Sequence, residues 1–153
     1  MEVNNRTGHG DRRSRLKEKH STLVATRAET LALYADLAQQ RPFVADEDTE
    51  GSLQDFCQSL IDYTASAHFQ LYRFIENNQE RRQTVAALAD RIYPEIVKTT
   101  DFILAFNDRY DVAVLDDRVD DLANDLSRLG EVLADRIQYE DELIQALMKG
   151  RRH

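Results

Sequence analysis

Several absences in the sequence limit what this protein can be. The 153 residues include one cysteine, two prolines, five glycines and no tryptophan. A lone cysteine, Cys57, cannot form a disulfide within the chain, which is typical of a reducing compartment. The shortage of glycine and proline argues against an all-β fold, because such folds need many tight turns. No apolar run approaches the roughly 18 residues of a membrane span, and the N-terminus has no apolar signal-peptide core. We therefore expect a cytoplasmic protein.

The motifs of common catalytic and metal sites are also missing. A di-iron bundle needs Glu-x-x-His pairs on two helices, whereas Lys17 and Ala65 stand three residues before His20 and His68. The sequence has no zinc-type cluster, no glycine-rich phosphate loop and no Gly-x-Ser-x-Gly motif. We expect no metal, no other cofactor and no catalytic residues, so the protein is not expected to be an enzyme.

The negative charge of the chain is concentrated in one segment. Between Asp108 and Glu142 there are 12 acidic and 4 basic residues, which accounts for the whole net charge of −8. Phosphates repel such a chain, so we expect no direct contact with nucleic acid. The segment suits a basic protein partner, or it is a solvated helix face that aids solubility.

Apolar residues recur at helical spacing in four segments. We expect helices from near Leu16 to Gln39, from Ser52 to about Glu76, over a third segment that contains Pro94, and from about Asp116 to Met148. Ser52 and Asp55 resemble a capping box at the start of the second helix. Pro94 should kink or break the third helix without ending its periodicity.

No strand pattern competes with these helices, and the connections between them are short. The expected fold is all-α, an antiparallel four-helix bundle with a kinked third helix. Residues 16–150 should form this single domain. Residues 1–15 contain four arginines and no apolar period, so we expect a mobile basic arm there.

Three charged residues stand in or beside the apolar stripes of the helices. Arg27 lies in the stripe of the first helix, and Glu140 lies in that of the last helix with Arg136 one turn before it. Buried charges must be paired, so we expect a structural polar network of these residues; a ligand or phosphate pocket around the arginines is the alternative. His68 stands in the core stripe of the second helix. We expect it to be a structural member of the polar network rather than a metal ligand, because no second histidine has a suitable spacing.

The second helix has an unusual composition on the side opposite its core stripe. A large aromatic residue stands there among small polar and charged residues, which is typical of a recognition patch. Phe69 would be the anchor and Asp62 would meet a basic group of the partner; the alternative is that the N-terminal arm or a loop covers Phe69. The candidate partner-binding residues are Asp55, Ser59, Asp62, Ser66, Phe69 and Arg73.

Several runs match a known family in order and spacing. They are Asp55 to Tyr63, Ser66 to Phe69, Tyr72, Ile92 to Pro94, Phe106 to Arg109, Leu129 to Glu131, Arg136 and Glu140 to Ile144. With these runs the chain resembles the regulator of sigma D family, the Rsd/AlgQ anti-sigma factors, from about Leu16 to Leu147. Relatives often carry an Asp-Arg-Trp-Leu run in the first helix, where this chain reads His20-Ser21-Thr22-Leu23.

The resemblance implies a function. Such proteins are helical, and they bind the primary sigma factor of RNA polymerase, mainly its C-terminal region four. Binding keeps that region from core polymerase and from the −35 promoter element, and so regulates transcription. Asp62 and Phe69 match family positions in the sigma interface. Two alternatives stay open: an adaptor that binds a metabolic signalling protein such as a sugar phosphotransfer carrier, and a small-molecule binder that uses Arg27, His68 and Glu140.

Overall fold

The computed structural model describes residues 7–72, 83–111 and 115–149, with side chains from residue 21 onward. Its elements are α1 (Thr7–Ala38), α2 (Glu47–Ala67), the π-helix η1 (His68–Tyr72), α4 (Gln83–Tyr110), the 3-10 helix η2 (Asp116–Arg118) and α5 (Val119–Lys149). The predicted all-α class is confirmed for the described part of the chain. Among these helices, none combines the length and the apolar character that a membrane crossing requires.

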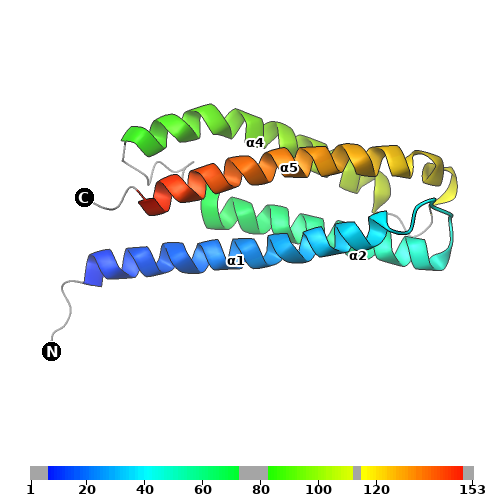
Figure 1. The fold of residues 1–153 in the computed structure, drawn as a ribbon, viewed down its shortest axis with the longest axis horizontal. Helices are drawn as coiled ribbons and strands as arrows, with labels where there is room; N and C mark the ends of the chain where they lie inside the picture. The colour runs from blue at the N-terminus through cyan, green and yellow to red at the C-terminus, as the bar shows by residue number, and fades with distance from the viewer. Residues whose placement is uncertain (1–6, 73–82, 112–114, 150–153) are drawn as a thin grey trace.

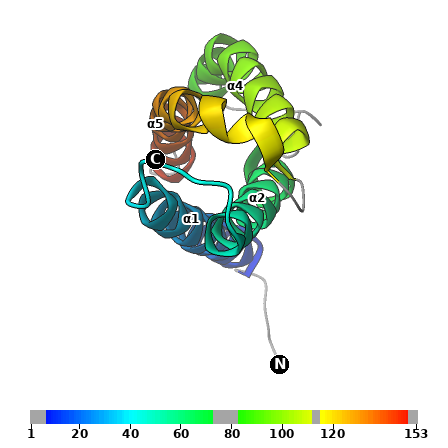
Figure 2. The ribbon, with the colours of Figure 1, turned by 90° about the vertical axis from the view of Figure 1, so that its right-hand side faces the viewer.

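The four long helices lie side by side, and the chain reverses direction from α1 to α2 and from α4 to α5 (Figure 1). Viewed from the end, α1, α2, α4 and α5 surround a common interior (Figure 2). Helix α1 contacts both α2 and α5, and α4 contacts the same two helices. Each long helix therefore packs against two neighbours.

The first helix begins at Thr7 and not near Leu16. The helix therefore starts earlier than predicted. Residues 1–6 lie outside the described residues, and the arm with its mobility stays a prediction. Residues 11–19 are mostly Arg, Lys, Leu and Glu, which are good helix formers. Once a helix is nucleated by packing further along, such residues extend it without an apolar stripe of their own.

The second helix also begins earlier than predicted, at Glu47 instead of Ser52. Its N-cap is Asp46, whose Oδ1 accepts a hydrogen bond from the Thr49 backbone N–H at 2.9 Å. The predicted capping box at Ser52 was wrong, since the Ser52 hydroxyl accepts from Gln40 Nε2 at 2.9 Å instead. The acidic residues of this first turn, Glu47, Asp48 and Glu50, are favourable there because they face the positive end of the helix dipole.

Helix α4 runs through Pro94 without a break, and a bend at this residue stays a prediction. The last helix follows the predicted segment closely, with η2 as its first turn. At the contact of α1 with α5, the Tyr34 hydroxyl donates to the Leu126 carbonyl at 2.8 Å. A Cβ built on Gly130 would overlap this hydroxyl, so the glycine is what lets Tyr34 approach α5.

Candidate functional site

One face of α2 and η1 is open to solvent along its length. Its exposed residues, which we call the α2 face, are Asp55, Gln58, Asp62, Ala65 and Phe69. They follow one another at spacings of three and four, so they form a single stripe along the helix. Phe69 is 58% exposed, more than any other large hydrophobic residue in the described part of the chain. The predicted positions of Asp55, Asp62 and Phe69 on an exposed face agree with this geometry.

Asp62 lies near the middle of the α2 face. Its Oδ1 accepts a hydrogen bond from Gln58 Nε2, one turn earlier, at 3.0 Å. A carboxylate can accept several hydrogen bonds at once, so this contact leaves Asp62 able to accept from an incoming cation. Gln58 thus orients the carboxylate without neutralising its charge.

Phe69 stands in η1, where its ring meets the ring of His68 edge to face, with centroids 5.2 Å apart. His68 is half-buried, so it lies at the margin of the interior. The predicted core stripe would place it fully inside. Within the described residues, no three side chains of His, Cys, Asp or Glu are close enough to hold a metal ion. A structural role for His68 stays a prediction.

The serines of the predicted patch do not lie on the α2 face. Ser59 is half-buried against α1, where its Oγ shares a 2.8 Å hydrogen bond with Thr30 and its carbonyl accepts from the same hydroxyl at 3.1 Å. Its expected solvent-facing position was wrong, because in a bundle a helix is covered on both flanks by neighbours and only a narrow stripe stays open. Ser66, two turns further on, is half-buried with its hydroxyl oxygen covered and without a hydrogen-bond partner. Arg73 lies outside the described residues.

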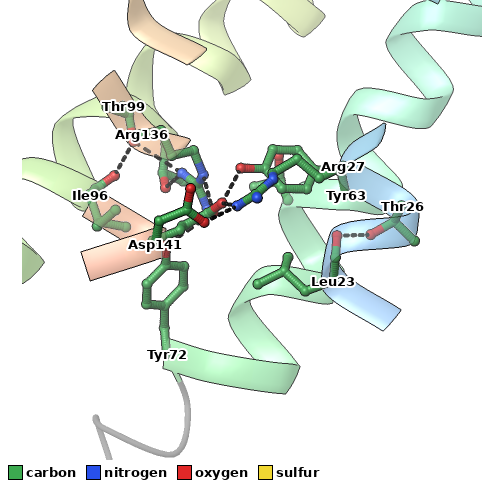
Figure 3. Close-up of polar contacts among 12 residues, drawn as sticks. Leu23, Thr26, Arg27, Tyr63, Tyr72, Ile96, Thr99, Arg136 and Asp141 are labelled. Carbon is green, nitrogen blue, oxygen red and sulfur yellow. Dashed lines mark hydrogen bonds and ion pairs between the residues drawn. The ribbon is translucent and has the colours of Figure 1, made fainter. Parts of the chain in front are cut away.

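A second group of polar residues lies in the interior. Glu140 of α5 is fully buried, and four side chains converge on its carboxylate. Oε1 accepts from Tyr63 OH at 2.7 Å and from Arg27 Nη1 at 3.3 Å, while Oε2 accepts from Tyr72 OH at 3.0 Å and from Arg136 Nε at 3.1 Å. The structure therefore brings Arg27, Arg136 and Glu140 together. We call Glu140 and these four partners the Glu140 cluster (Figure 3).

The positive charges of the cluster have further partners. Arg136 is 1% exposed and its Nη1 donates to Thr99 Oγ1 at 3.1 Å and to Thr100 Oγ1 at 2.7 Å. Arg27 also pairs with Asp141, with Nη1 and Oδ1 3.0 Å apart. Two arginines thus face two carboxylates, which is the balance that a buried ionic group needs. Because the charges of the two arginines and the two carboxylates already neutralise each other, the geometry favours a structural network over a pocket for an anion.

The two tyrosines of the cluster are held as hydrogen-bond donors. Burial raises the pKa of Tyr63, and the negative charge of Glu140 raises it further. The same two causes, in the same order, raise the pKa of Tyr72 well above its usual value. Both hydroxyls therefore keep their protons at neutral pH and donate to Glu140. In addition, the Arg136 guanidinium carbon lies 5.6 Å from the centroid of each ring, within the range of a cation–π contact.

A comparison with protein families covers almost all of the described chain. The family model described as "Regulator of RNA polymerase sigma(70) subunit, Rsd/AlgQ" matches residues 10–148. The chain belongs to the Rsd/AlgQ family. The resemblance found from the sequence runs is thereby confirmed.

Curated members of the Rsd/AlgQ family are similar to parts of this chain. A protein of Yersinia enterocolitica named "Regulator of sigma D" is 38% identical over 98 residues, which are 63% of this chain and 59% of the relative. Proteins of the same name from Yersinia pseudotuberculosis and Shigella dysenteriae are 38% identical over 96 residues (61% and 57% of the two chains) and 34% identical over 104 residues (67% and 65%). The chain thus spans about three fifths of the length of the Yersinia relatives. No solved structure matches the chain.

Sequence reasoning missed two groups of residues in and around the Glu140 cluster. Thr99 and Thr100 support Arg136 from α4, and hydroxyl residues in an apolar stripe were the available signal. Tyr63 and Tyr72 were not assigned to the polar network at all. Nothing in a regular helix places both on one side, and the reason they meet is the turn between them.

Proposed function

We propose that this protein binds the primary sigma factor of RNA polymerase, mainly through the C-terminal region four of sigma, and keeps that region from core polymerase and the −35 promoter element. The observation that carries the proposal is an exposed Phe69 on the same face as Asp62, in a chain of a family described as a regulator of the sigma(70) subunit. An aromatic side chain that is more than half exposed in the free protein is typical of a binding surface.

The charge of the chain supports this partner. A region that reads promoter DNA has a basic surface, because it must neutralise phosphates. This chain carries a net charge of −8, and the excess lies between Asp108 and Glu142, in the end of α4 and in α5. Opposite charges on this chain and on sigma accelerate their encounter, and they disfavour acidic proteins as partners. By occupying the basic surface, the protein would compete with DNA directly.

The mechanism assigns different roles to the residues of the surface. Asp62 accepts charge-assisted hydrogen bonds from a basic residue of sigma, with Gln58 holding its carboxylate in place. Phe69 fills an apolar recess and supplies most of the binding free energy as a hot spot. Asp55 lies at the margin of the contact, and the half-buried Ser66 lies beside the α2 face and not on it. Ser59 contributes by fixing α2 on α1 through Thr30.

The proposal treats the four long helices as one domain, an antiparallel four-helix bundle that carries the α2 face on its outside. The bundle acts as a rigid support, since interface residues on packed helices lose little conformational freedom on binding. Such a regulator works where RNA polymerase works, in the cytoplasm.

Calorimetric titration of the full chain tests this function. The titrants are the full-length primary sigma factor of the same organism and a version of it that lacks region four. We expect binding of the full-length factor and a loss of at least about tenfold in affinity for the shortened one. Equal affinity for the two factors would contradict the assignment to region four, and no binding of either would contradict the function.

A further inference from the structure

Phe69 lies in a turn of unusual geometry. Helix α2 ends at Ala67, and the chain continues without interruption into η1, a π-helix from His68 to Tyr72. Single π-turns are rare, and they occur frequently at functional sites. In this chain the π-turn contains the most exposed large hydrophobic residue of the described part.

The two tyrosines that flank Phe69 show what the π-turn achieves. Tyr63 and Tyr72 are nine positions apart, which is roughly two and a half turns of a regular α-helix and would place them on opposite sides. Both side chains are nevertheless buried, at 1% and 3% exposure, and both hydroxyls reach the carboxylate of Glu140. A π-turn closes its hydrogen bonds over five residues instead of four, so each residue advances by a smaller angle. This smaller advance turns Tyr72 back toward the side of Tyr63.

We propose that Glu140 clamps η1 through Tyr63 and Tyr72, and that this clamp fixes the position in which Phe69 is presented to sigma. The inference rests on the proposed function and deepens it. Tyr63, Tyr72 and Glu140 are then positioning residues, because they are buried and act on the partner only through Phe69.

The contacts of Glu140 suit it to this task. Tyr63 binds one carboxylate oxygen and Tyr72 binds the other, so a single side chain of α5 holds the segment before and the segment after Phe69. In Figure 3 the Tyr72 side chain points from the end of η1 toward Arg136. Hydrogen bonds to an ionised acceptor are stronger than neutral ones, so the clamp is a firm one.

The clamp can be loosened without leaving a buried charge unpaired. When Tyr72 is changed to Phe, Oε2 of Glu140 still accepts from Arg136 Nε at 3.1 Å, and the aromatic ring stays in the interior. The protein should therefore remain folded. Tyr110 provides a matched control, since it is also fully buried and its hydroxyl donates to a carboxylate, Asp125, on the contact of α4 with α5.

The experiment compares Tyr72→Phe with Tyr110→Phe in calorimetric titrations of full-length sigma. Loss of one hydrogen bond is worth about a factor of five to ten in an equilibrium constant. We expect Tyr72→Phe to bind sigma about five- to tenfold more weakly and Tyr110→Phe to bind with wild-type affinity. Equal affinities of the two variants would overturn the inference, because a general loss of stability would then explain any change.

A double-mutant cycle tests whether Tyr72 acts through Phe69. In a chain that already carries Phe69→Ala, Tyr72→Phe should cause no further loss of affinity, since the residue that it positions is gone. The same loss in both backgrounds would overturn the inference, because Tyr72 would then act independently of Phe69.

Amide hydrogen exchange separates this inference from the proposed function. Exchange of the backbone amides of His68–Tyr72 should be about fivefold faster in Tyr72→Phe than in Tyr110→Phe, whether or not sigma is the partner. If the wild-type chain fails to bind sigma, the proposed function and the presentation of Phe69 to sigma are wrong, while faster exchange still supports the clamp on η1. Equal exchange in the two variants overturns the clamp itself.

Discussion

The α2 face and the Glu140 cluster use similar side chains in opposite ways. Each combines a carboxylate with aromatic side chains of α2 and η1, although Glu140 itself belongs to α5. In the interior, Glu140 has four partners, and every charge near it is balanced. On the surface, Asp62 has Gln58 as a neutral neighbour, and Phe69 is 58% exposed. A carboxylate whose hydrogen-bonding positions are all used stabilises one arrangement of the helices. A carboxylate that can still accept hydrogen bonds can bind a partner.

The largest expected loss of stability comes from breaking the Glu140 cluster. Glu140→Ala would leave Arg136 buried beside the two tyrosines without its carboxylate. Removing one partner of a buried pair typically costs about 3–5 kcal/mol of stability. Chemical denaturation followed by circular dichroism measures this loss. Glu142→Ala is the control, because Glu142 pairs with the exposed Arg91 at 3.4 Å and should contribute less than about 1 kcal/mol. Equal stability of the two variants would show that Glu140 is not a buried, paired residue.

The next effect concerns binding and should leave the fold intact. Phe69→Ala should weaken sigma binding by about 2 kcal/mol or more if Phe69 is a hot spot, with little change in the denaturation midpoint. Titration calorimetry of the folded variant gives the affinity. Leu104→Ala is the control, since Leu104 of α4 is 48% exposed but lies on another helix and should bind as the wild type does. A Phe69 variant with wild-type affinity would remove the α2 face from the interface.

A third change sharpens the comparison. It strains the packing of α1 on α5 at a place outside both the α2 face and the Glu140 cluster. The Cβ of Gly130→Ala would displace the Tyr34 hydroxyl and break its hydrogen bond to Leu126. Overpacking of this kind costs about 1–3 kcal/mol. Gly51→Ala is the matched control, because nothing lies within 4 Å of a Cβ there, and alanine in an exposed helix should add up to about 1 kcal/mol of stability. The prediction fails if thermal melts shift in the same direction for both.

Parts of this comparison could be predicted from the sequence. Helical spacing placed Arg27 and Glu140 on the stripes of two helices, and a buried charge needs an opposite one, so their meeting followed from periodicity alone. The same reasoning separated Asp62 and Phe69 from the core. It failed for Ser59, because spacing gives the direction of a side chain on its own helix but not which flank a neighbouring helix covers.

The π-turn could not be predicted in this way. A wheel of 3.6 residues per turn assumes a constant angle, and that assumption placed His68 in the core stripe and kept Tyr72 out of the polar network. The start of α2 was missed for a different reason. Asp46 and the acidic residues after it are equally suited to a loop and to a capped first turn, and only the backbone hydrogen bond from Thr49 decides between them.

The smallest expected effect tests whether the Asp62 carboxylate contributes to sigma binding through a specific contact. Asp62→Ala should weaken sigma binding by about 1 kcal/mol, because the hydrogen bond that it would lose is charge-assisted but close to solvent. Asp120→Ala is the control, since Asp120 is exposed at the start of α5 and adds only to the general negative charge. Stopped-flow measurements over a range of salt concentrations distinguish the two. Loss of the Asp62 contact should mainly raise the dissociation rate, whereas loss of Asp120 should lower the association rate and its dependence on salt. If both variants changed only the association rate, Asp62 would act as part of a diffuse field, and the difference between the α2 face and the rest of the acidic surface would disappear.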